Sequence, residues 1–464
     1  MPKLKLSALI ATLFAAHCGL AHAQSNAELK AELDALKAQV KRLEALLEKK
    51  QADDAAKAET VDVAEFNRIR IKTEAMEDAQ EVMGFKGLKI SGYIDPTYIH
   101  NRNAKTSSFV FLNNNSSVNG SEESFGYDNT FFGSAMLNIE KEIEGGSRLK
   151  LSIMPSKSTS SGYNFGNLVH EASFSIPLGE DPTTRLIGGQ VPDWSGYEYI
   201  PSNQNKLITH NMLFDFSAAN FYTGVGMELT RGKWISKFML GNMNRARIDT
   251  AQQKTPGLFY RVDYAKGEFQ GFGFSGIHSG FDDKSQFGRL DIVEIDGYFI
   301  RADWTLQGQL TWGRQKPTPG NQFANGRTQW TGLSALAGYK FTPRFEGIAR
   351  LDYIWNSKNG GGLLGSTFAT GCKDAGGADA LCPDGRNGFG AAMVFDGANW
   401  LVADPTRGVN RMALSLGWQY ALMPGVNLKG EYRYDRASGA VFKNANGDYV
   451  RDNHIFGFST VFSF

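Results

Sequence analysis

The sequence predicts an all-β protein, a 16-stranded transmembrane antiparallel β-barrel preceded by an N-terminal α-helical coiled coil. From about residue 87, apolar and polar residues alternate, which indicates strands with two chemically different faces. Of the 464 residues, 52 are glycine and 12% are aromatic, while 42% are apolar. After the N-terminal segment no apolar run reaches the length of a membrane-spanning helix, so a helical membrane protein is excluded.

The charge of the chain is nearly balanced. Lys and Arg together number 49, Asp and Glu together number 48, and the net charge is +1. Proteins that bind nucleic acid usually carry a clear excess of basic residues on one face or in one domain. We therefore expect no nucleic acid among the partners of this chain.

The N-terminus predicts export. Lys3 and Lys5 precede an apolar stretch from Leu6 to Leu20, and Ala21-His22-Ala23 has the small-x-small pattern of a cleavage site. Residues 1–23 are therefore expected to form a secretory signal peptide. The alternative is a buried N-terminal helix.

Residues 24–50 predict a coiled coil. Ser25 and Glu28 form a capping box. Apolar residues then recur at alternating spacings of four and three, at Leu29, Leu33, Leu36, Val40, Leu43 and Leu47. This heptad pattern favours self-association over a helix that docks on its own domain, and it leaves dimer and trimer open. Residues 51–86 read as a linker and a second helical segment, and 87–464 remain for the barrel.

The predicted strands carry apolar side chains on one face and charged side chains on the other. Residues 424–436 are typical, with Val426, Leu428, Tyr432 and Tyr434 opposite Asn427, Lys429, Glu431, Arg433 and Asp435. A water-soluble sandwich would bury the apolar face, whereas a membrane barrel turns it toward lipid and the charges toward the lumen. Export, this alternation and a terminal phenylalanine favour the membrane barrel.

The connections predict the number of strands. In outer-membrane barrels, short periplasmic turns alternate with longer external loops. Long connections are expected at 101–125, 155–167, 192–219, 244–256, 279–289, 315–327, 357–408 and 437–451, with short turns between them. This pattern gives 16 strands if 192–219 is one external loop. If 210–217 is a strand, the count becomes 18.

No motif indicates catalysis. Residues 271–276 match G-x-G-x-x-G, but the apolar alternation continues through them, whereas a nucleotide site needs a strand before the motif and a helix after it. The histidines are scattered and lack the spacing of metal ligands. We therefore expect no enzyme activity, no cofactor and no metal site.

Two cysteines, Cys372 and Cys382, remain after removal of the signal peptide. The residues between them are rich in Gly, Ala and Asp, which is the composition of a loop. An even pair of cysteines in an exported protein suggests a disulfide. We expect this bond to close the tip of an external loop.

A family resemblance rests on three segments: the signal peptide, the sequence Gln24-Ser25-Asn26-Ala27-Glu28-Leu29-Lys30, and the sequence Gly87-Leu88-Lys89-Ile90-Ser91-Gly92-Tyr93-Ile94. Together they resemble a family of porin-like outer-membrane proteins of unassigned substrate. The plan is also similar to that of the trimeric DcaP-type porins, which carry a periplasmic coiled coil. The resemblance implies an outer-membrane homotrimer with a periplasmic N-terminal segment, in contact with the lipid bilayer and lipopolysaccharide.

The resemblance also assigns roles to residues. The terminal Phe464 and Phe462 match the last-strand signal that the barrel-assembly machinery reads. In general porins the third external loop folds into the lumen, a position that residues 192–219 occupy here. The acids of this constriction loop would be Asp193, Glu198 and Asp215.

Charged residues on the polar faces of the last strands are expected to line the pore: Arg344, Arg350, Arg411, Lys429, Arg433, Glu346, Asp352 and Glu431. One interpretation is a basic wall opposite the acids of the constriction loop, and the alternative is mutual neutralisation by ion pairs. We expect a porin that passes small hydrophilic solutes by passive diffusion. The alternative function is a structural or adhesive barrel tethered through its coiled coil.

Overall fold

The computed structural model divides the chain into two compact units, Met1–Lys86 and Gly87–Phe464. The residues that it describes are 38, 41, 67–73, 85–112, 132–155, 168–179, 181–217, 221–244, 256–267, 270–279, 287–317, 327–358, 368–383 and 390–464. Residues 67–73 are helical. The predicted signal peptide and the predicted coiled coil, apart from residues 38 and 41, lie outside the described residues. Within the described ranges, no helix is long and apolar enough to cross a membrane.

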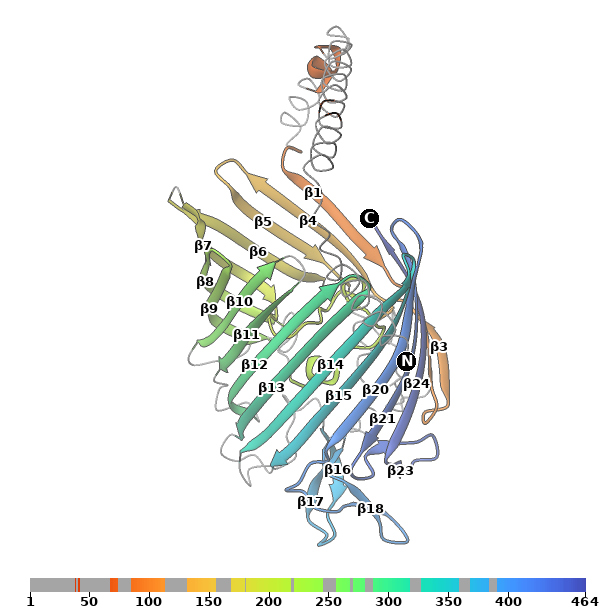
Figure 1. The fold of residues 1–464 in the computed structure, drawn as a ribbon. Coiled ribbons are helices and arrows are strands. Elements are labelled where there is room, and N and C mark those ends of the chain that lie inside the picture. The colour runs from red at the N-terminus through yellow and green to blue at the C-terminus, as the bar shows by residue number, and fades with distance from the viewer. Residues whose placement is uncertain are drawn as a thin grey trace, which may run out of the picture. The chain divides into compact units, whose positions relative to one another are not determined.

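The second unit is dominated by one antiparallel sheet that closes on itself (Figure 1). Its strands are β1 (Leu88–Ile94), β2 (Thr97–Asn101), β3 (Thr106–Val110), β4 (Ala135–Ile143), β5 (Ser147–Ile153), β6 (Val169–Leu178), β7 (Asp181–Pro192), β8 (Phe221–Arg231), β9 (Trp234–Asn244), β10 (Gly257–Gly267), β11 (Gln270–Ser279), β12 (Phe287–Arg301), β13 (Trp304–Pro317), β14 (Thr328–Thr342), β15 (Phe345–Lys358), β20 (Arg411–Met423), β21 (Val426–Ala437) and β24 (Asp452–Ser463).

These strands make a closed barrel of 16 strands, as the sequence predicts. Two barrel positions are each occupied by two strands: β1 and β2 both pair with β24, while β4 pairs with β1 and β3 pairs with β2. Pro96 lies between β1 and β2, and proline has no N–H to donate to a neighbouring strand. The count of 18 required a strand at 210–217, where the structure instead has the helix α4 (Met212–Ser217).

The first connection differs from the prediction. A single long loop was expected over 101–125, but the chain turns back within 102–105, where Lys105 has a φ of 51°, and forms β3. The second position of the barrel is shared by β3 and β4, and the chain between them includes Gly133, which also has a positive φ of 67°. The reason is that β2 pairs with β3 along its whole length, and the sequence pattern does not reveal this hairpin.

The remaining connections lie where they are expected. Short turns join the strands at one end, shown at the top of Figure 1, and long connections join them at the other. The longest, between β15 and β20, contains β16 (Phe368–Lys373), β17 (Asp379–Pro383), β18 (Met393–Phe395) and β19 (Trp400–Val402). The last contains β22 (Phe442–Lys443) and β23 (Tyr449–Val450). Cys372 and Cys382 form a disulfide between β16 and β17.

The outer face of the barrel is apolar. Leu306, Leu310, Leu351, Leu416 and Phe458 are among its exposed side chains. Aromatic residues gather toward both ends, with Trp234, Trp304, Phe341 and Phe345 near the short turns and Phe109 and Trp355 near the long connections. Phe345 and Trp355 both lie on β15, ten positions apart. At about 3.3 Å per residue and a strand tilt of about 40°, this separates the two aromatic zones by about 25 Å along the barrel axis.

Candidate functional site

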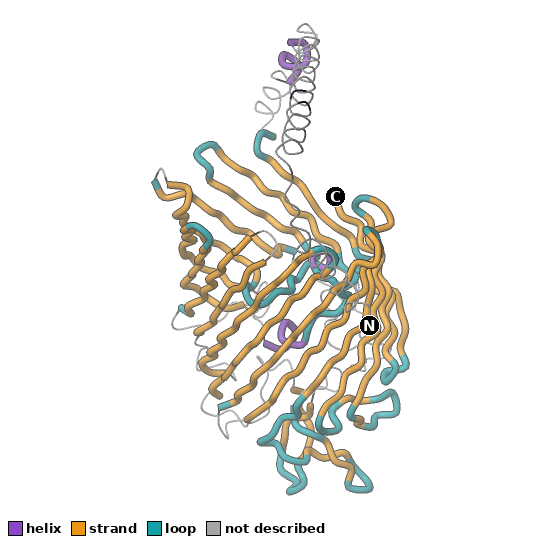
Figure 2. The backbone as a smooth tube through the Cα atoms, viewed as in Figure 1, coloured by secondary structure: helices purple, strands orange, loops and turns teal. Residues whose placement is uncertain are grey.

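The connection between β7 and β8 folds into the barrel. Residues 193–217, named here the inserted segment, contain η2 (Ser202–Gln204) and α4. Figure 2 shows its helical turns inside the ring of strands. Its polar atoms bond to inward-facing side chains of β15, β20 and β21, which are far from β7 and β8 in the barrel. The inserted segment therefore crosses the lumen, as its position in the chain implies.

Four buried cations line the strands that receive this segment. Arg350 on β15, Arg411 on β20, and Lys429 and Arg433 on β21 are all buried and are named here the basic wall. Arg350 and Arg433 each pair in register with Ser415 of β20, so the two residues lie at one level of the barrel with β20 between their strands. Strand alternation places all four side chains on the inner face.

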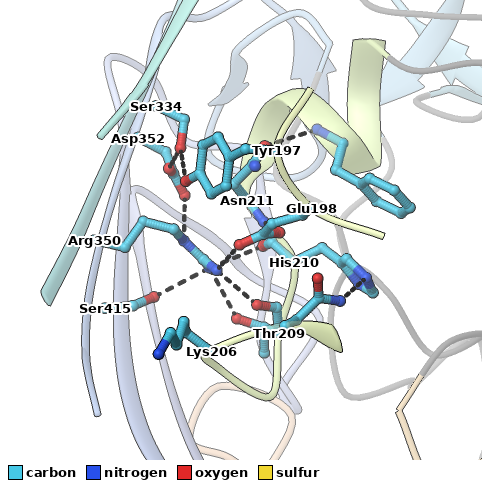
Figure 3. Close-up of polar contacts among 12 residues, drawn as sticks. Tyr197, Glu198, Lys206, Thr209, His210, Asn211, Ser334, Arg350, Asp352 and Ser415 are labelled. Atoms are coloured by element: carbon cyan, nitrogen blue, oxygen red, sulfur yellow. Dashed lines mark hydrogen bonds and ion pairs between the residues drawn. The ribbon is translucent and has the colours of Figure 1, made fainter. Parts of the chain in front are cut away.

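Arg350 makes the densest contacts with the inserted segment (Figure 3). Its Nη1 donates to Glu198 Oε1 (2.8 Å) and to the carbonyl oxygen of Thr209 (2.7 Å). Its Nη2 donates to the carbonyl oxygen of His210 (2.9 Å), and its Nε donates to Asp352 Oδ2 (3.2 Å). One guanidinium thus holds the backbone and an acid of the inserted segment and an acid of its own strand.

Arg433 and Arg411 share the neighbouring acid. Arg433 Nη1 donates to the carbonyl oxygen of His210 (2.6 Å), while its Nε donates to Asp435 Oδ2 (3.1 Å). Arg411 Nη2 donates to Asp435 Oδ1 (2.7 Å). Arg433, which the sequence predicts to line the pore, is therefore fully buried under the inserted segment and paired with an acid. Exchange of Arg433 for Glu would place a second carboxylate beside Asp435.

Residues 202–206 of the inserted segment are bonded to two strands of the barrel wall, β21 and β15. Lys429 Nζ donates to the carbonyl oxygens of Ser202 (2.6 Å) and Asn205 (2.7 Å). Lys206 of the segment forms an ion pair with Glu346 of β15, with 2.7 Å between Nζ and Oε2.

Glu431 of β21 accepts three bonds from the inserted segment. They come from the backbone N–H of Ile208 (2.8 Å), the N–H of Thr209 (2.7 Å) and Thr209 Oγ1 (2.7 Å). These bonds satisfy the buried carboxylate of Glu431 together with two backbone N–H groups of the inserted segment.

The helix α4 adds an apolar contact. Met212, Leu213 and Phe216 are buried in one cluster with Trp330 of β14 and Ile354 of β15. Trp330 Nε1 also donates to Ser217 Oγ (2.9 Å). Gly332 lies beside this helix, and a Cβ at that position would collide with the side chain of Leu213. A glycine on the wall strand therefore makes room for the helix.

Some of the predicted site residues do not lie where the sequence predicts them. Arg344 is exposed in the β14–β15 turn instead of lining the pore, because β15 begins only at Phe345. Asp193 does not face the basic wall, since its carboxylate accepts bonds from the backbone N–H of Ser195 (2.9 Å) and from the Tyr222 hydroxyl. Glu198 forms the ion pair with the basic wall, and Asp215 lies in α4.

Burial raises the pKa of Glu198 above its ordinary value, and the nearby Arg350 guanidinium opposes this rise. The basic wall is thus largely occupied: its cations hold the inserted segment and neutralise acids on both sides of the contact. Sequence reasoning missed Lys206, Thr209 and His210. His210 accepts through its carbonyl oxygen, and Thr209 bonds through its carbonyl oxygen, its N–H and its hydroxyl. No residue pattern identifies the backbone contacts.

The open part of the lumen lies on the other side of the inserted segment. A cavity of about 840 Å³ extends between this segment and the strands β1, β4 to β13 and β24. Its charged lining residues are Glu140, Lys150, Glu171, Asp193, Glu198, Glu228, Lys237, Arg261, Asp263 and Asp296. Carboxylates outnumber cations in this set, so the cavity carries an excess of negative charge. Its aromatic lining residues include Tyr199 and Tyr298.

The cations of this cavity are paired with acids. Lys150 lies 2.9 Å from Glu171, and Arg261 Nη1 lies 2.8 Å from Asp296. Arg261 also donates to the carbonyl oxygen of Trp194 (2.7 Å), which ties the start of the inserted segment to β10. Among the described residues, no group of three or more His, Cys, Asp or Glu side chains could hold a metal ion.

The chain end closes the barrel. Phe464 N–H donates to the carbonyl oxygen of Gly92 (3.1 Å), and Gly92 N–H donates to the carbonyl oxygen of Phe464 (3.1 Å). The side chains of Phe462 and Phe464 are exposed. The last strand thus pairs with the first through backbone bonds and leaves its terminal aromatic side chains accessible.

A family model described as "Protein of unknown function (DUF3138)" matches residues 61–257 and 269–464. No protein of curated function matches the chain.

Solved structures of outer-membrane proteins are similar to the chain at low identity. The outer membrane channel DcaP of Acinetobacter baumannii is 10% identical with a TM-score of 0.48, over 81% of this chain and 97% of that one. An anion-selective porin from Comamonas acidovorans is 11% identical with a TM-score of 0.47, over 81% and 99%. A loop-deletion mutant of OmpT, an outer membrane protein of Vibrio cholerae, is 10% identical with a TM-score of 0.49, over 81% and 99%. DcaP-type channels are also the porins that the sequence resembles.

Proposed function

We propose that this chain, which belongs to the DUF3138 family of proteins of unknown function, is an outer-membrane porin for small hydrophilic solutes. The observation that carries the proposal is the lumen: a polar cavity of about 840 Å³ lies beside an inserted segment that is fixed to the opposite wall. Barrels of 16 to 18 strands leave an aqueous channel. Passive diffusion needs nothing further from the protein.

The membrane location is supported by the outer face. A closed barrel has no unpaired strand edge, which lipid would not tolerate. The apolar band between the two aromatic zones, about 25 Å tall, matches the hydrocarbon zone of an outer membrane. We place the long connections outside the cell and the short turns in the periplasm, together with the N-terminal segment. A homotrimer assembled through the predicted coiled coil, and insertion by the barrel-assembly machinery, belong to the same proposal.

The charge of the cavity indicates the preferred solutes. The cations of the basic wall are buried under the inserted segment. They are bonded to acids and to backbone carbonyl oxygens, so they contribute little charge to the open cavity. The exposed cavity carries more carboxylates than cations. A narrow passage lined by one sign of charge concentrates counter-ions of the opposite sign. We therefore expect the pore to prefer cations and cationic or neutral polar solutes.

Conductance tests the porin function directly. The full-length protein is inserted into planar bilayers, with empty detergent as control, and single-channel currents and reversal potentials are recorded in a salt gradient. We expect stepwise ohmic currents and a reversal potential of the sign for cations. A folded barrel that inserts without conducting would contradict the proposal and favour a structural or adhesive role.

A single variant tests the origin of the selectivity. Glu140 lines the cavity, and within the described residues no ion pair neutralises it. Glu140→Gln is expected to reduce the preference for cations, most clearly at about 0.1 M salt or below, where screening is weaker. Asp303→Asn makes the same charge change in the exposed β12–β13 turn and serves as the control. An equal reversal potential for Glu140→Gln and wild type would place the selectivity elsewhere.

A further inference from the structure

A cluster of charged side chains lies on the outer face of the barrel, where apolar side chains are the rule. His278 of β11, Asp291 of β12 and Arg314 of β13 are register partners across three neighbouring strands. Arg289, two residues before Asp291 on β12, donates to the Asp291 carboxylate and so lies on the same side of the sheet. Strand alternation turns the neighbouring Leu290 and Ile292 into the buried interior, so these four polar side chains point away from the lumen.

The cluster lies at the edge of the apolar band. Val293 and Trp312 form the next pair on this face, and Ile295 and Leu310 form the one after it. Ile295 and Leu310 are 56% and 53% exposed, as expected of side chains that face lipid. The cluster is on the side of the long connections, because β11 ends at Ser279 and β13 ends at Pro317. In the proposed orientation, this is the headgroup level of the outer leaflet.

The geometry of the cluster leaves cationic donors facing outward. Asp291 accepts from His278 Nδ1 (2.9 Å), from Arg289 Nε (3.2 Å) and from Arg314 Nε (2.9 Å). The Asp291 side chain is 6% exposed and the Arg289 side chain 60% exposed, so the cations cover the acid. Arg289 contacts Asp291 through Nε, and Arg314 contacts it through Nε and Nη2. Two guanidinium groups around one carboxylate leave a net positive charge.

Such an arrangement suits a phosphate group. Arginine binds phosphate through paired N–H donors, and a shared carboxylate fixes the guanidinium planes before the ligand arrives. Arg314 lies over the ring of Trp312, with 5.4 Å between its Cζ and the ring centroid, which holds it at the apolar boundary. An amphiphile can place its phosphate on the arginines and its acyl chains against Val293, Ile295 and Leu310.

We propose that Arg289, Asp291, Arg314 and His278 form a binding site for the phosphate of an outer-leaflet lipid, the lipid A part of lipopolysaccharide. The site rests on the proposed membrane location and orientation, but not on transport. Because it faces away from the lumen, its loss should leave the single-channel conductance unchanged. Failure of the channel and failure of the lipid site are therefore distinguishable.

The test compares two double variants of the full chain in detergent. Arg289→Gln with Arg314→Gln removes the site, while Arg301→Gln with Arg344→Gln makes the same charge change at the exposed short-turn end. Each protein is titrated with bisphosphorylated lipid A, with dephosphorylated lipid A and with inorganic phosphate. Native mass spectrometry counts the bound molecules, and heat-modifiable mobility on gels reports that the barrel is folded.

We expect bisphosphorylated lipid A to bind wild type and the control variant equally, and the site variant at least tenfold more weakly. Dephosphorylated lipid A should bind wild type at least tenfold more weakly than the bisphosphorylated form. Equal binding to all three proteins would overturn the proposal, as would equal binding of the two lipids or binding of inorganic phosphate as tight as that of lipid A. If the site variant does not fold, Arg289→Gln alone serves, because Asp291 then keeps Arg314 and His278; it should still weaken lipid binding severalfold.

Discussion

At the scale of single residues, Arg350 shows how a predicted pore-lining group becomes a structural one. Strand alternation correctly indicates that it points inward. Whether an inward arginine meets water or protein depends on the inserted segment, whose path is set by contacts with carbonyl oxygens of Thr209 and His210. Backbone atoms carry no sequence signal. The inner face was therefore predictable, but the occupancy of the basic wall was not.

Removal of this guanidinium should loosen the inserted segment without unfolding the barrel. Breaking a buried ion pair by deleting one partner costs about 3–5 kcal/mol, and Arg350→Gln leaves Glu198 and Asp352 without it. We expect faster hydrogen exchange in peptides of residues 193–217 and a larger, noisier conductance. Arg344→Gln, in an exposed turn, is the control. Unchanged exchange in the Arg350 variant would show that other contacts hold the segment.

Glu198 predicts a pH dependence. Burial raises its folded-state pKa above the ordinary value, so the folded state binds the proton more tightly than the unfolded state. The stability that Glu198 contributes is full below its unfolded-state pKa and is lost as pH rises through the raised folded-state value.

Glu198→Gln imitates the protonated side chain and should flatten this dependence. Hydrogen exchange of the inserted segment, measured from about pH 4 to about pH 8 and corrected for intrinsic rates, should rise with pH more steeply in wild type than in the variant. Parallel curves for the two proteins would rule out Glu198 as the source. The variant should also be milder than Arg350→Gln, because Arg350 keeps Asp352 as a partner.

At the scale of elements, the helix α4 is the feature that local sequence misassigns. Met212 to Phe216 reads as a strand because it is apolar and short, and short apolar runs do not distinguish the two structures. Its true environment is the concave inner face of β13, β14 and β15. A helix of this length is stable only through such packing. The space for it is visible in the sequence only as Gly332, one glycine among many in the strands.

The contact between Gly332 and Leu213 can be tested by a pair of substitutions. Gly332→Val introduces a branched side chain where Leu213 already lies, and overpacking of this kind costs about 1–3 kcal/mol. We expect faster hydrogen exchange in α4 and little change in the thermal unfolding of the barrel. Adding Leu213→Ala should restore slow exchange at least in part. If the double variant exchanges faster than Gly332→Val alone, the two side chains do not compete for one space.

At the scale of the whole molecule, alternation and connection lengths were sufficient to predict a 16-stranded barrel. Both are repeated along the chain, so errors at one position do not change the result. The first hairpin was missed because β2 and β3 are each only five residues long. Single features, such as a tight turn at 102–105, leave weaker traces in the sequence than repeated ones.

Assembly of the predicted homotrimer is a property of the whole molecule that the heptad pattern predicts. Deletion of residues 25–50 removes the apolar seam of the predicted coiled coil, and buried a and d positions stabilise helix association. We expect the deletion variant to form a folded barrel whose trimer dissociates at a lower temperature in detergent. Heated and unheated gel mobility measures both. An unaltered dissociation temperature, or a monomeric wild-type protein, would contradict the prediction.

The reciprocal backbone bonds between Gly92 and Phe464 also determine when the barrel can close during folding. Every other pairing in the barrel joins strands that are consecutive, or nearly consecutive, along the chain. Such pairs can form as soon as both strands have been synthesised. The pairing of β1 and β2 with β24 spans the whole barrel sequence, and loop closure over that length carries the largest entropic cost. The ring can therefore become complete only after the last strand has been synthesised and delivered. Until then, β1 presents an unpaired edge, and the nascent chain depends on factors that shield it from aggregation.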